Sequence, residues 1–148
     1  MTTSGSGASV RSNRGGPNED SYLAHDGLGL YVVCDGASEG PAGDLAASTA
    51  VATIEGLVRD ERLAEGESLL RAFGRRQVAT RCVRAAMDAV VSATADAHDR
   101  EGMATTISVV LVHGQTATIG HVGDSRVYLA RSGQLHQLTS DMELTVSP

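Results

Sequence analysis

The stretch NEDSYLAHDGLGLYVVCDG, residues 18–36, decides how the chain begins to fold. Two strand-like runs flank the turn dipeptide Asp26-Gly27, which predicts a β-hairpin. The runs cover residues 21–24 and 28–36. The second run is apolar until it ends on Asp35, and an ionised carboxylate at the edge of a core is costly unless it is paired or binds a metal. Asp35 therefore marks the first candidate site.

Length and composition bound the remaining possibilities. The chain has 148 residues, 41% of them hydrophobic and 20% charged, which indicates one globular domain. Residues 1–9 are mostly Gly, Ser and Thr and predict a flexible tail, so we expect the domain to cover residues 10–148. Cys34 and Cys82 lack paired spacing and are interpreted as reduced core thiols.

Charge and hydropathy exclude two classes of partner. A net charge of -6, from 18 Asp+Glu against 12 Lys+Arg, argues against nucleic-acid binding. No apolar run approaches the ~18 residues of a membrane helix, and the N-terminus has no signal-peptide core. The sequence thus predicts a cytoplasmic protein with neither nucleic-acid nor membrane partners.

Hydrophobic periodicity predicts the other elements. Small or apolar residues recur at helical spacing in two segments, residues 40–63 and about 68–97, with Gly74 as a break or bend in the second. A strand pattern returns at residue 104 and predicts an antiparallel meander. Its strands cover residues 104–112, 116–122, 125–130 and 134–138, and a short strand also fits residues 8–12. Strands, two helices and strands again indicate an α+β layered fold.

Acidic residues gather at the predicted strand ends: Glu19 and Asp20, Asp35, and Asp124 in GHVGDSRVYLARSG. Mg²⁺ and Mn²⁺ prefer oxygen ligands, and Mg²⁺ needs only a few carboxylates. Neighbouring strand residues face opposite ways, so Glu19 and Asp20 cannot both bind one ion directly from a regular strand. Gly36 is expected to turn the chain tightly and to leave its carbonyl open to a cation. Taken singly, CDG is better explained as a strand followed by a turn, and NED as a loop that caps itself.

Taken in order, these motifs resemble the metal-dependent protein phosphatase family, the PPM or type 2C serine/threonine phosphatases, over about residues 12–141. The matching pieces are NED, CDG, GPAGDLAA, ATT and VGDSRVYLARSGQLHQLTSD. The resemblance implies a β-sandwich of antiparallel sheets flanked by helices, incomplete at the C-terminus. It implies metal ligands at Glu19, Asp20, Asp35, Gly36 and Asp124.

The resemblance also implies the chemistry. Two Mg²⁺ or Mn²⁺ ions, with a third held more weakly, would activate water to hydrolyse phosphoserine or phosphothreonine. Asp35 would bridge two of the ions and take the catalytic role. The implied partners are proteins phosphorylated by a serine/threonine kinase, which places the chain in signal transduction.

Several departures from the family pattern keep an alternative open. DGASEG, residues 35–40, replaces the usual Asp-Gly-Met-Gly-Gly-His. Gly15 stands where the family has a phosphate-binding arginine, so Arg14 is the candidate for that role. The family's later Ser-Asp-Gly and Asp-Asn are absent. The alternative is a catalytically impaired pseudophosphatase or truncated fragment that binds or regulates phosphoproteins. The five histidines, His121 among them, are assigned to surface or turn positions.

Overall fold

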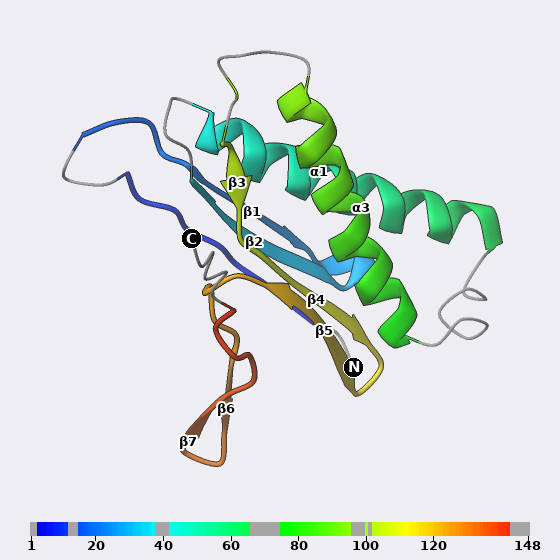
Figure 1. Ribbon diagram of the computed structural model, residues 1–148. Helices are drawn as coiled ribbons and strands as arrows, with labels where there is room; N and C mark the ends of the chain where they lie inside the picture. The colour runs from blue at the N-terminus through cyan, green and yellow to red at the C-terminus, as the bar shows by residue number, and fades with distance from the viewer. Residues whose placement is uncertain are drawn as a thin grey trace.

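The computed structural model describes residues 3–11, 15–37, 42–65, 75–95, 100 and 102–142. Within these residues, two helices cover one face of an antiparallel sheet, and a separate β-hairpin extends away from the sheet (Figure 1). The predicted α+β class with antiparallel sheets is confirmed. None of the described helices is both long and apolar enough to cross a membrane.

The N-terminal hairpin forms where the sequence predicts it, although its turn differs. β1 (Asp20–His25) pairs antiparallel with β2 (Leu30–Ala37). The connection is a 3₁₀ turn over Asp26–Leu28, and the left-handed residue that ends it is Gly29, with φ 57°. Gly29 is required there because a β-carbon would overlap the carbonyl oxygen of Val112 on a neighbouring strand. The turn expected at Asp26-Gly27 is therefore longer than a two-residue loop.

The helices and remaining strands follow in the predicted order. They are α1 (Gly43–Glu65), α3 (Arg75–Ala95), β3 (Ala104–Thr105), β4 (Ile107–His113), β5 (Thr116–Val122), β6 (Tyr128–Arg131) and β7 (Gln134–Gln137). The main sheet has the order β1-β2-β4-β5, and β3 pairs with the end of β2. Pro41, Leu70, Phe73 and Gly74, which supported the helix predictions, lie outside the described residues.

The predicted meander is wrong in one place. β4 and β5 pair, and β6 and β7 pair, but β6 does not continue the main sheet. The strand expected from residue 125 begins only at Tyr128, because residues 125–127 leave the sheet after Gly123, whose φ is 102°. Residues 8–11 likewise form no strand.

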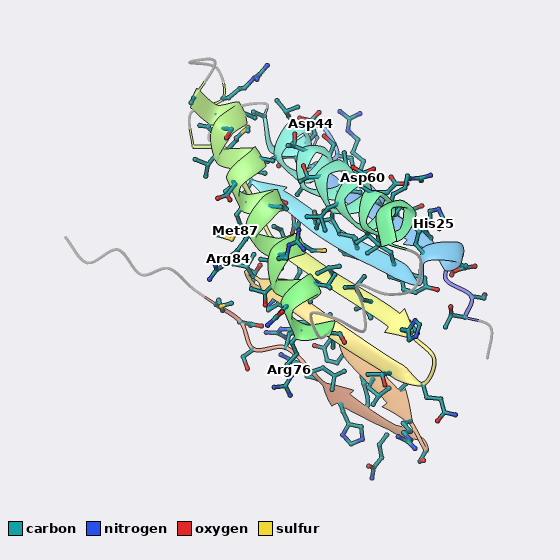
Figure 2. All side chains as sticks on the ribbon, turned by 90° about the vertical axis from the view of Figure 1, so that its right-hand side faces the viewer. His25, Asp44, Asp60, Arg76, Arg84 and Met87 are labelled. Carbon is teal, nitrogen blue, oxygen red and sulfur yellow. The ribbon has the colours of Figure 1, made fainter. Side chains whose placement is uncertain are left out.

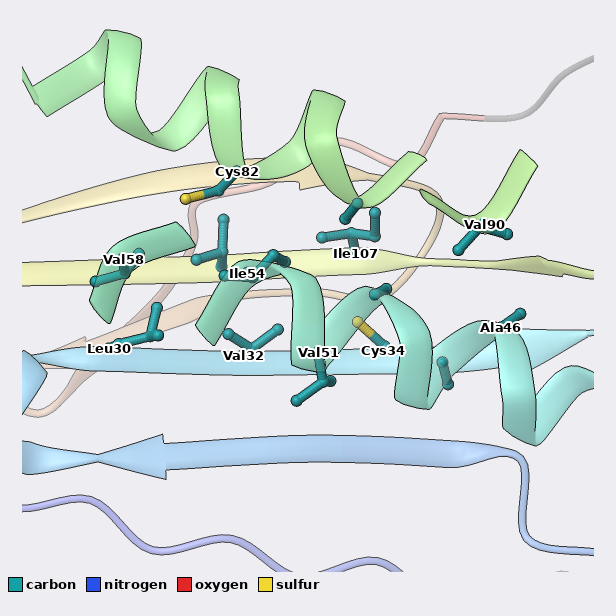
Figure 3. Packing of buried hydrophobic residues seen from close by; sticks show 14 of the residues in the cluster. Leu30, Val32, Cys34, Ala46, Val51, Ile54, Val58, Cys82, Val90 and Ile107 are labelled. Carbon is teal, nitrogen blue, oxygen red and sulfur yellow. The ribbon is translucent and has the colours of Figure 1, made fainter. Parts of the chain in front are cut away.

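The core lies between the sheet and the helices. Alternate residues of β2 face the helices, and Leu30, Val32 and Cys34 are at most 1% exposed. They pack beneath Ile54 of α1 and beside Ile107 of β4 (Figure 3). Cys34 and Cys82 are buried and form no disulfide, as predicted, and burial raises the pKa of the Cys34 thiol to about 12. Charged residues such as Asp60 and Arg84 lie on the outer side of the helices (Figure 2).

The opposite face of the sheet carries the other half of each strand. Tyr31, Val33 and Asp35 alternate with the core residues of β2, and Val33 is 52% exposed. A groove of about 530 Å³ runs over this face, with Asp20, Asp35, Ser108 and Arg126 among the residues that line it. Asp35 was expected at the edge of the core, but strand alternation places it on the face turned away from the helices. We call this side the open face.

The N-terminal residues lie across the open face and form one wall of the groove. A β-carbon at Gly5 would overlap the Tyr31 ring, and one at Gly7 would overlap the Tyr22 ring. The glycines therefore let the backbone lie directly on two aromatic rings. The amide of Gly5 also donates to Asp26 Oδ1 at 2.8 Å.

Candidate metal centre

Strand pairing brings two of the predicted ligands together. Asp20 of β1 and Asp35 of β2 are direct partners in the antiparallel register, so their side chains share the open face. The two carboxyl groups lie close enough for Asp20 to be among the causes that raise the pKa of Asp35 after burial. The hairpin thus brings together two residues that are 15 positions apart in the sequence.

The Asp35 carboxyl is surrounded by negative charge. Asp35 is exposed on β2, but the atoms around its carboxyl still desolvate it in part and raise its pKa, and so do the neighbouring charges of Asp20, Asp124 and, as the last contribution, Glu19. The hydrogen bond to Asp20 acts in the same direction. All of these causes disfavour an ionised Asp35, and a bound cation would act against them. The site is therefore suited to a positive charge.

The backbone of Asp35 is held by the two threonines of ATT. Its amide donates to Thr106 Oγ1 at 3.0 Å. Its carbonyl accepts from the Thr106 amide at 2.9 Å and from Thr105 Oγ1 at 3.0 Å. Since all three contacts join residues about 70 positions apart, the end of β2 is anchored to β3 and to the residue that follows it, and not only to its hairpin partner.

Asn18 and Ser9 hold Asp20 from the other side. The Asn18 side-chain amide donates to Ser9 Oγ at 2.7 Å, and the Ser9 hydroxyl donates to Asp20 Oδ2 at 3.1 Å. Asn18 Oδ1 also accepts from the Asp20 amide at 3.3 Å. The asparagine of NED therefore orients the aspartate that follows it, a role that the sequence prediction did not assign.

The side chain of Glu19, which precedes β1, lies beside the start of α1. A β-carbon added at Gly43 would lie 2.5 Å from Glu19 Oε1, so the carboxylate sits beside the first helical turn, where the helix dipole favours negative charge. This agrees with the expectation that Glu19 and Asp20 do not both reach one point from a regular strand.

Gly36 does not form the expected tight turn. It lies within β2, and its amide donates to the Glu19 carbonyl at 3.1 Å. A β-carbon at Gly36 would overlap the carbonyl oxygen of Gly43. The residue is a glycine because α1 approaches the strand there, and not because the chain reverses.

Asp124 follows the end of β5 in a turn anchored at both sides. Gly123 has a φ of 102° and lies against Thr106, where a β-carbon would come 2.7 Å from Thr106 Cγ2. Ser125 Oγ lies 2.6 Å from Thr106 Oγ1. Thr106 therefore contacts both the Asp124 turn and the Asp35 backbone, which places the two aspartates near one another.

Arg126 is engaged elsewhere. Its Nε and Nη2 atoms donate to the two carboxylate oxygens of Asp141 at 2.9 Å and 2.5 Å. This bidentate pair lowers the pKa of Asp141 and joins the segment after β5 to the segment after β7. Arg126 thus lines the groove with its guanidinium paired to Asp141.

The structure thus brings Asp20 and Asp35 into contact, with Asp124 and Glu19 nearby. Among the described residues, however, no three acidic, histidine or cysteine side chains converge closely enough to form a ready-made ion site. Arg14 and residues 38–40 lie outside the described residues, so the phosphate-binding prediction stays a prediction. Sequence reasoning assigned no role at the site to Thr106, between β3 and β4, to Ser108 and His121, which are paired on β4 and β5, or to Ser125, which follows β5.

Comparison with known proteins decides the family. The sequence matches the family described as protein phosphatase 2C over residues 7–145. The chain belongs to the protein phosphatase 2C family. Serine/threonine protein phosphatase PstP of Mycobacterium tuberculosis is 36% identical to it over 135 residues, which are 89% of this chain and 24% of PstP. Protein phosphatase PhpP of Streptococcus pneumoniae is 46% identical over 43 residues, 29% of this chain and 18% of PhpP.

Solved structures agree with this protein phosphatase 2C assignment. The crystal structure of M. tuberculosis PstP superposes with a TM-score of 0.71 at 32% identity, covering 89% of this chain and 50% of the PstP chain. The PstP catalytic domain in complex with two manganese ions gives 0.70 at 34% identity, covering 89% and 51%. This protein phosphatase 2C chain therefore spans about half of the solved PstP chains and about a quarter of the curated PstP sequence.

Proposed function

We propose that this chain carries part of a Mg²⁺- or Mn²⁺-dependent serine/threonine protein phosphatase centre, whose substrates are phosphoserine and phosphothreonine proteins. The observation that supports this most is the position of Asp35, which is the register partner of Asp20 on the open face and has Asp124 and Glu19 nearby. Like charges this close repel one another, and because Asp20, Asp35 and Asp124 are exposed, water screens part of that repulsion; a bound cation would remove the rest. The manganese-bound PstP structure supports the same class of metal.

The donor set fits a hard divalent cation. Asp20, Asp35 and Asp124 offer carboxylate oxygens, Glu19 immediately precedes β1, and Gly36 follows Asp35 in β2. These residues would hold the two ions that we propose, with Asp124 as the ligand of a third. Ions bound there would supply an activated water and stabilise negative charge on the phosphoryl oxygens.

The residues of the chain would keep this donor set in place. Thr105 and Thr106 fix the Asp35 backbone, and Asn18 and Ser9 fix the Asp20 carboxylate. Pre-organised ligands matter because each must be oriented before the cation and the phosphoryl group arrive. Arg14 is proposed to bind the phosphate, and the phosphoproteins are proposed to be products of a serine/threonine kinase.

A second candidate is a phosphoprotein-binding module without turnover. It is favoured by one observation, that no three candidate ligands among the described residues converge on a single ion position. In this second candidate, the chain would bind a phosphopeptide and release no phosphate from it.

Phosphate release from a phosphothreonine peptide, measured with and without MnCl₂, separates the two candidates. We expect Mn²⁺-dependent release from the natural sequence and a drop of at least ~100-fold in Asp35→Ala, since even residues behind the metal ligands typically contribute 10–100-fold. Asp60→Ala is the matched control, because Asp60 is an exposed carboxylate on α1 with no contact to the centre (Figure 2). Equal release from the natural sequence and Asp35→Ala would remove the proposed mechanism.

Peptide binding completes the comparison. Fluorescence anisotropy measures whether the natural sequence binds the phosphopeptide. Binding without phosphate release at any MnCl₂ concentration would support the second candidate, the phosphoprotein-binding module.

A further inference from the structure

His121 lies at the centre of a hydrogen-bond network on the open face. It is the register partner of Ser108 across β4 and β5, and its Nδ1 lies 3.0 Å from Ser108 Oγ. Its Nε2 lies 3.0 Å from the Gly123 carbonyl oxygen. The sequence prediction of a surface or turn position is wrong, because His121 sits within a strand, partly buried, with a partner on each ring nitrogen.

The partners assign the proton of the neutral ring. A carbonyl oxygen can only accept, so Nε2 carries the hydrogen and donates to Gly123. Nδ1 is then an acceptor, and the Ser108 hydroxyl donates to it. Ser108 is only 5% exposed, and a buried hydroxyl without a partner would be costly. Its other contact, the Ser125 carbonyl, is longer at 3.4 Å.

This network ends at the Asp124 turn. The Gly123 carbonyl accepts from His121 and also from the Met142 amide at 2.9 Å. One residue beyond Asp124, the Ser125 hydroxyl contacts Thr106. Asp124 therefore lies between two anchored residues, with His121 holding one anchor and Thr106 the other.

We propose that His121 is a positioning residue that holds the Asp124 turn against the end of β2. It acts through the Gly123 carbonyl, and it ties that carbonyl to β4 through Ser108. The consequence for cation binding rests on the proposed function, because it requires Asp124 to be a metal ligand. The consequence for the turn does not.

Amide hydrogen exchange of the metal-free protein tests the positioning directly. In His121→Ala we expect faster exchange in residues 123–127 and at Met142, whose amide is bonded to Gly123, with no change in β1 and β2. His136→Ala is the matched control, since His136 is an exposed histidine on β7. Ser108→Ala, which leaves the contact between Nε2 and Gly123, should give a smaller increase.

A second variant guards against a folding defect. His121→Gln keeps a side-chain amide that can donate to Gly123, and exchange in its turn should lie between that of the natural sequence and that of His121→Ala. Unchanged exchange at residues 123–127 in both His121 variants would overturn the proposal.

Titration with MnCl₂ by calorimetry tests the route through Asp124. We expect His121→Ala to weaken Mn²⁺ binding about tenfold, as residues behind metal ligands do. In an Asp124→Ala background the same substitution should have no further effect. If His121→Ala weakens Mn²⁺ binding by the same factor in the Asp124→Ala background as in the natural sequence, His121 does not act through Asp124, and the proposal is overturned. Absence of Mn²⁺ binding in the natural sequence would count against the proposed function, while the exchange experiment still decides the positioning.

Discussion

At the scale of single residues, the candidate site is defined by like charges held close together. Asp20 and Asp35 share a register position, and burial together with Asp20, Asp124 and Glu19 raises the pKa of Asp35. Because the folded-state pKa lies above the unfolded value, ionised Asp35 opposes folding. This destabilisation is absent at a pH below the pKa of Asp35 in the unfolded state, and it grows as the pH rises through the pKa in the folded state.

Replacing this charge should stabilise the metal-free protein. We expect Asp35→Asn to raise the Tm at pH 7 without divalent cations, because the uncharged amide removes the repulsion from its neighbours. The gain should shrink as the pH falls below the ordinary pKa of an aspartate, where Asp35 is protonated in both states. Thermal unfolding measured between pH 3 and pH 8, the range suggested by the usual aspartate pKa of about 3.9, checks this. A lower Tm for Asp35→Asn at pH 7 would contradict it.

Gly36 should tolerate no side chain. A methyl group there would overlap the Gly43 carbonyl oxygen, which belongs to backbone and cannot rotate away. We expect Gly36→Ala to lower the free energy of unfolding by about 2 kcal/mol or more, as overpacking does. Gly56→Ala is the matched control, since nothing lies within 4 Å of its added methyl group and alanine favours the helix by about 0.5–1 kcal/mol. Urea unfolding should show a lower free energy of unfolding for Gly36→Ala and a higher one for Gly56→Ala than for the natural sequence.

At the scale of elements, α1 and α3 stabilise the sheet from one side only. Small residues of α1, including Ala46, Ala47 and Ala50, are fully buried and allow close packing, and Ile54 fills the space above β2 (Figure 3). In the part of the chain that the structure describes, no helix covers the β6–β7 hairpin, and every residue of both strands is exposed (Figure 1). The contacts beside it are polar: the pair between Arg126 and Asp141, and the hydrogen bond from the Met142 amide to the Gly123 carbonyl.

Truncating the core residue of α1 should be far more costly than truncating an exposed one. We expect Ile54→Ala to reduce the free energy of unfolding by about 3 kcal/mol, since the side chain is fully buried and leaves a cavity. Val91→Ala, on α3 and 68% exposed, should change it by no more than about 0.5 kcal/mol. Similar losses in chemical denaturation of the two variants would show that the helices do not pack as described.

Removing the Arg126–Asp141 pair should loosen the hairpin and little else. The pKa of Asp141 is lowered by Arg126, so its contribution is present above the ordinary aspartate pKa and is lost as the pH falls through the lowered value. We expect Asp141→Asn to speed amide exchange in residues 128–138 at pH 7, and the difference to narrow in high salt, because both side chains are exposed. Exchange in β4 should stay the same.

At the scale of the whole molecule, the two faces of the sheet carry different residues. The helix-covered face holds the core, whereas the open face holds the groove and the carboxylates at one end of the sheet. The candidate site is therefore carried by the stable hairpin of β1 and β2 and completed by segments that arrive from elsewhere, residues 9, 106 and 124–125.

Divalent cations should stabilise the folded chain if this site binds them. At a free MnCl₂ concentration 100 times the Kd, the expected gain in unfolding free energy is about 2.7 kcal/mol. Asp20→Asn combined with Asp35→Asn should abolish the gain, and Asp60→Asn should preserve it. A Tm that does not depend on MnCl₂ in the natural sequence would argue against a cation site here.

Sequence periodicity by itself determined much of the fold: the first hairpin, both helices, the β4–β5 pair and the buried cysteines follow from local patterns of apolar residues and turn dipeptides. The motif order also indicated the family and the acidic residues Asp20 and Asp35. Only the tertiary structure decided that Asp35 meets Thr106, that β6 leaves the sheet, that Gly36 allows α1 to approach β2, and that His121 reaches the Asp124 turn. Local patterns report which residues alternate or recur along one segment. Contacts such as that between Asp35 and Thr106, 71 positions apart, depend on which segments the packing of the whole chain brings together.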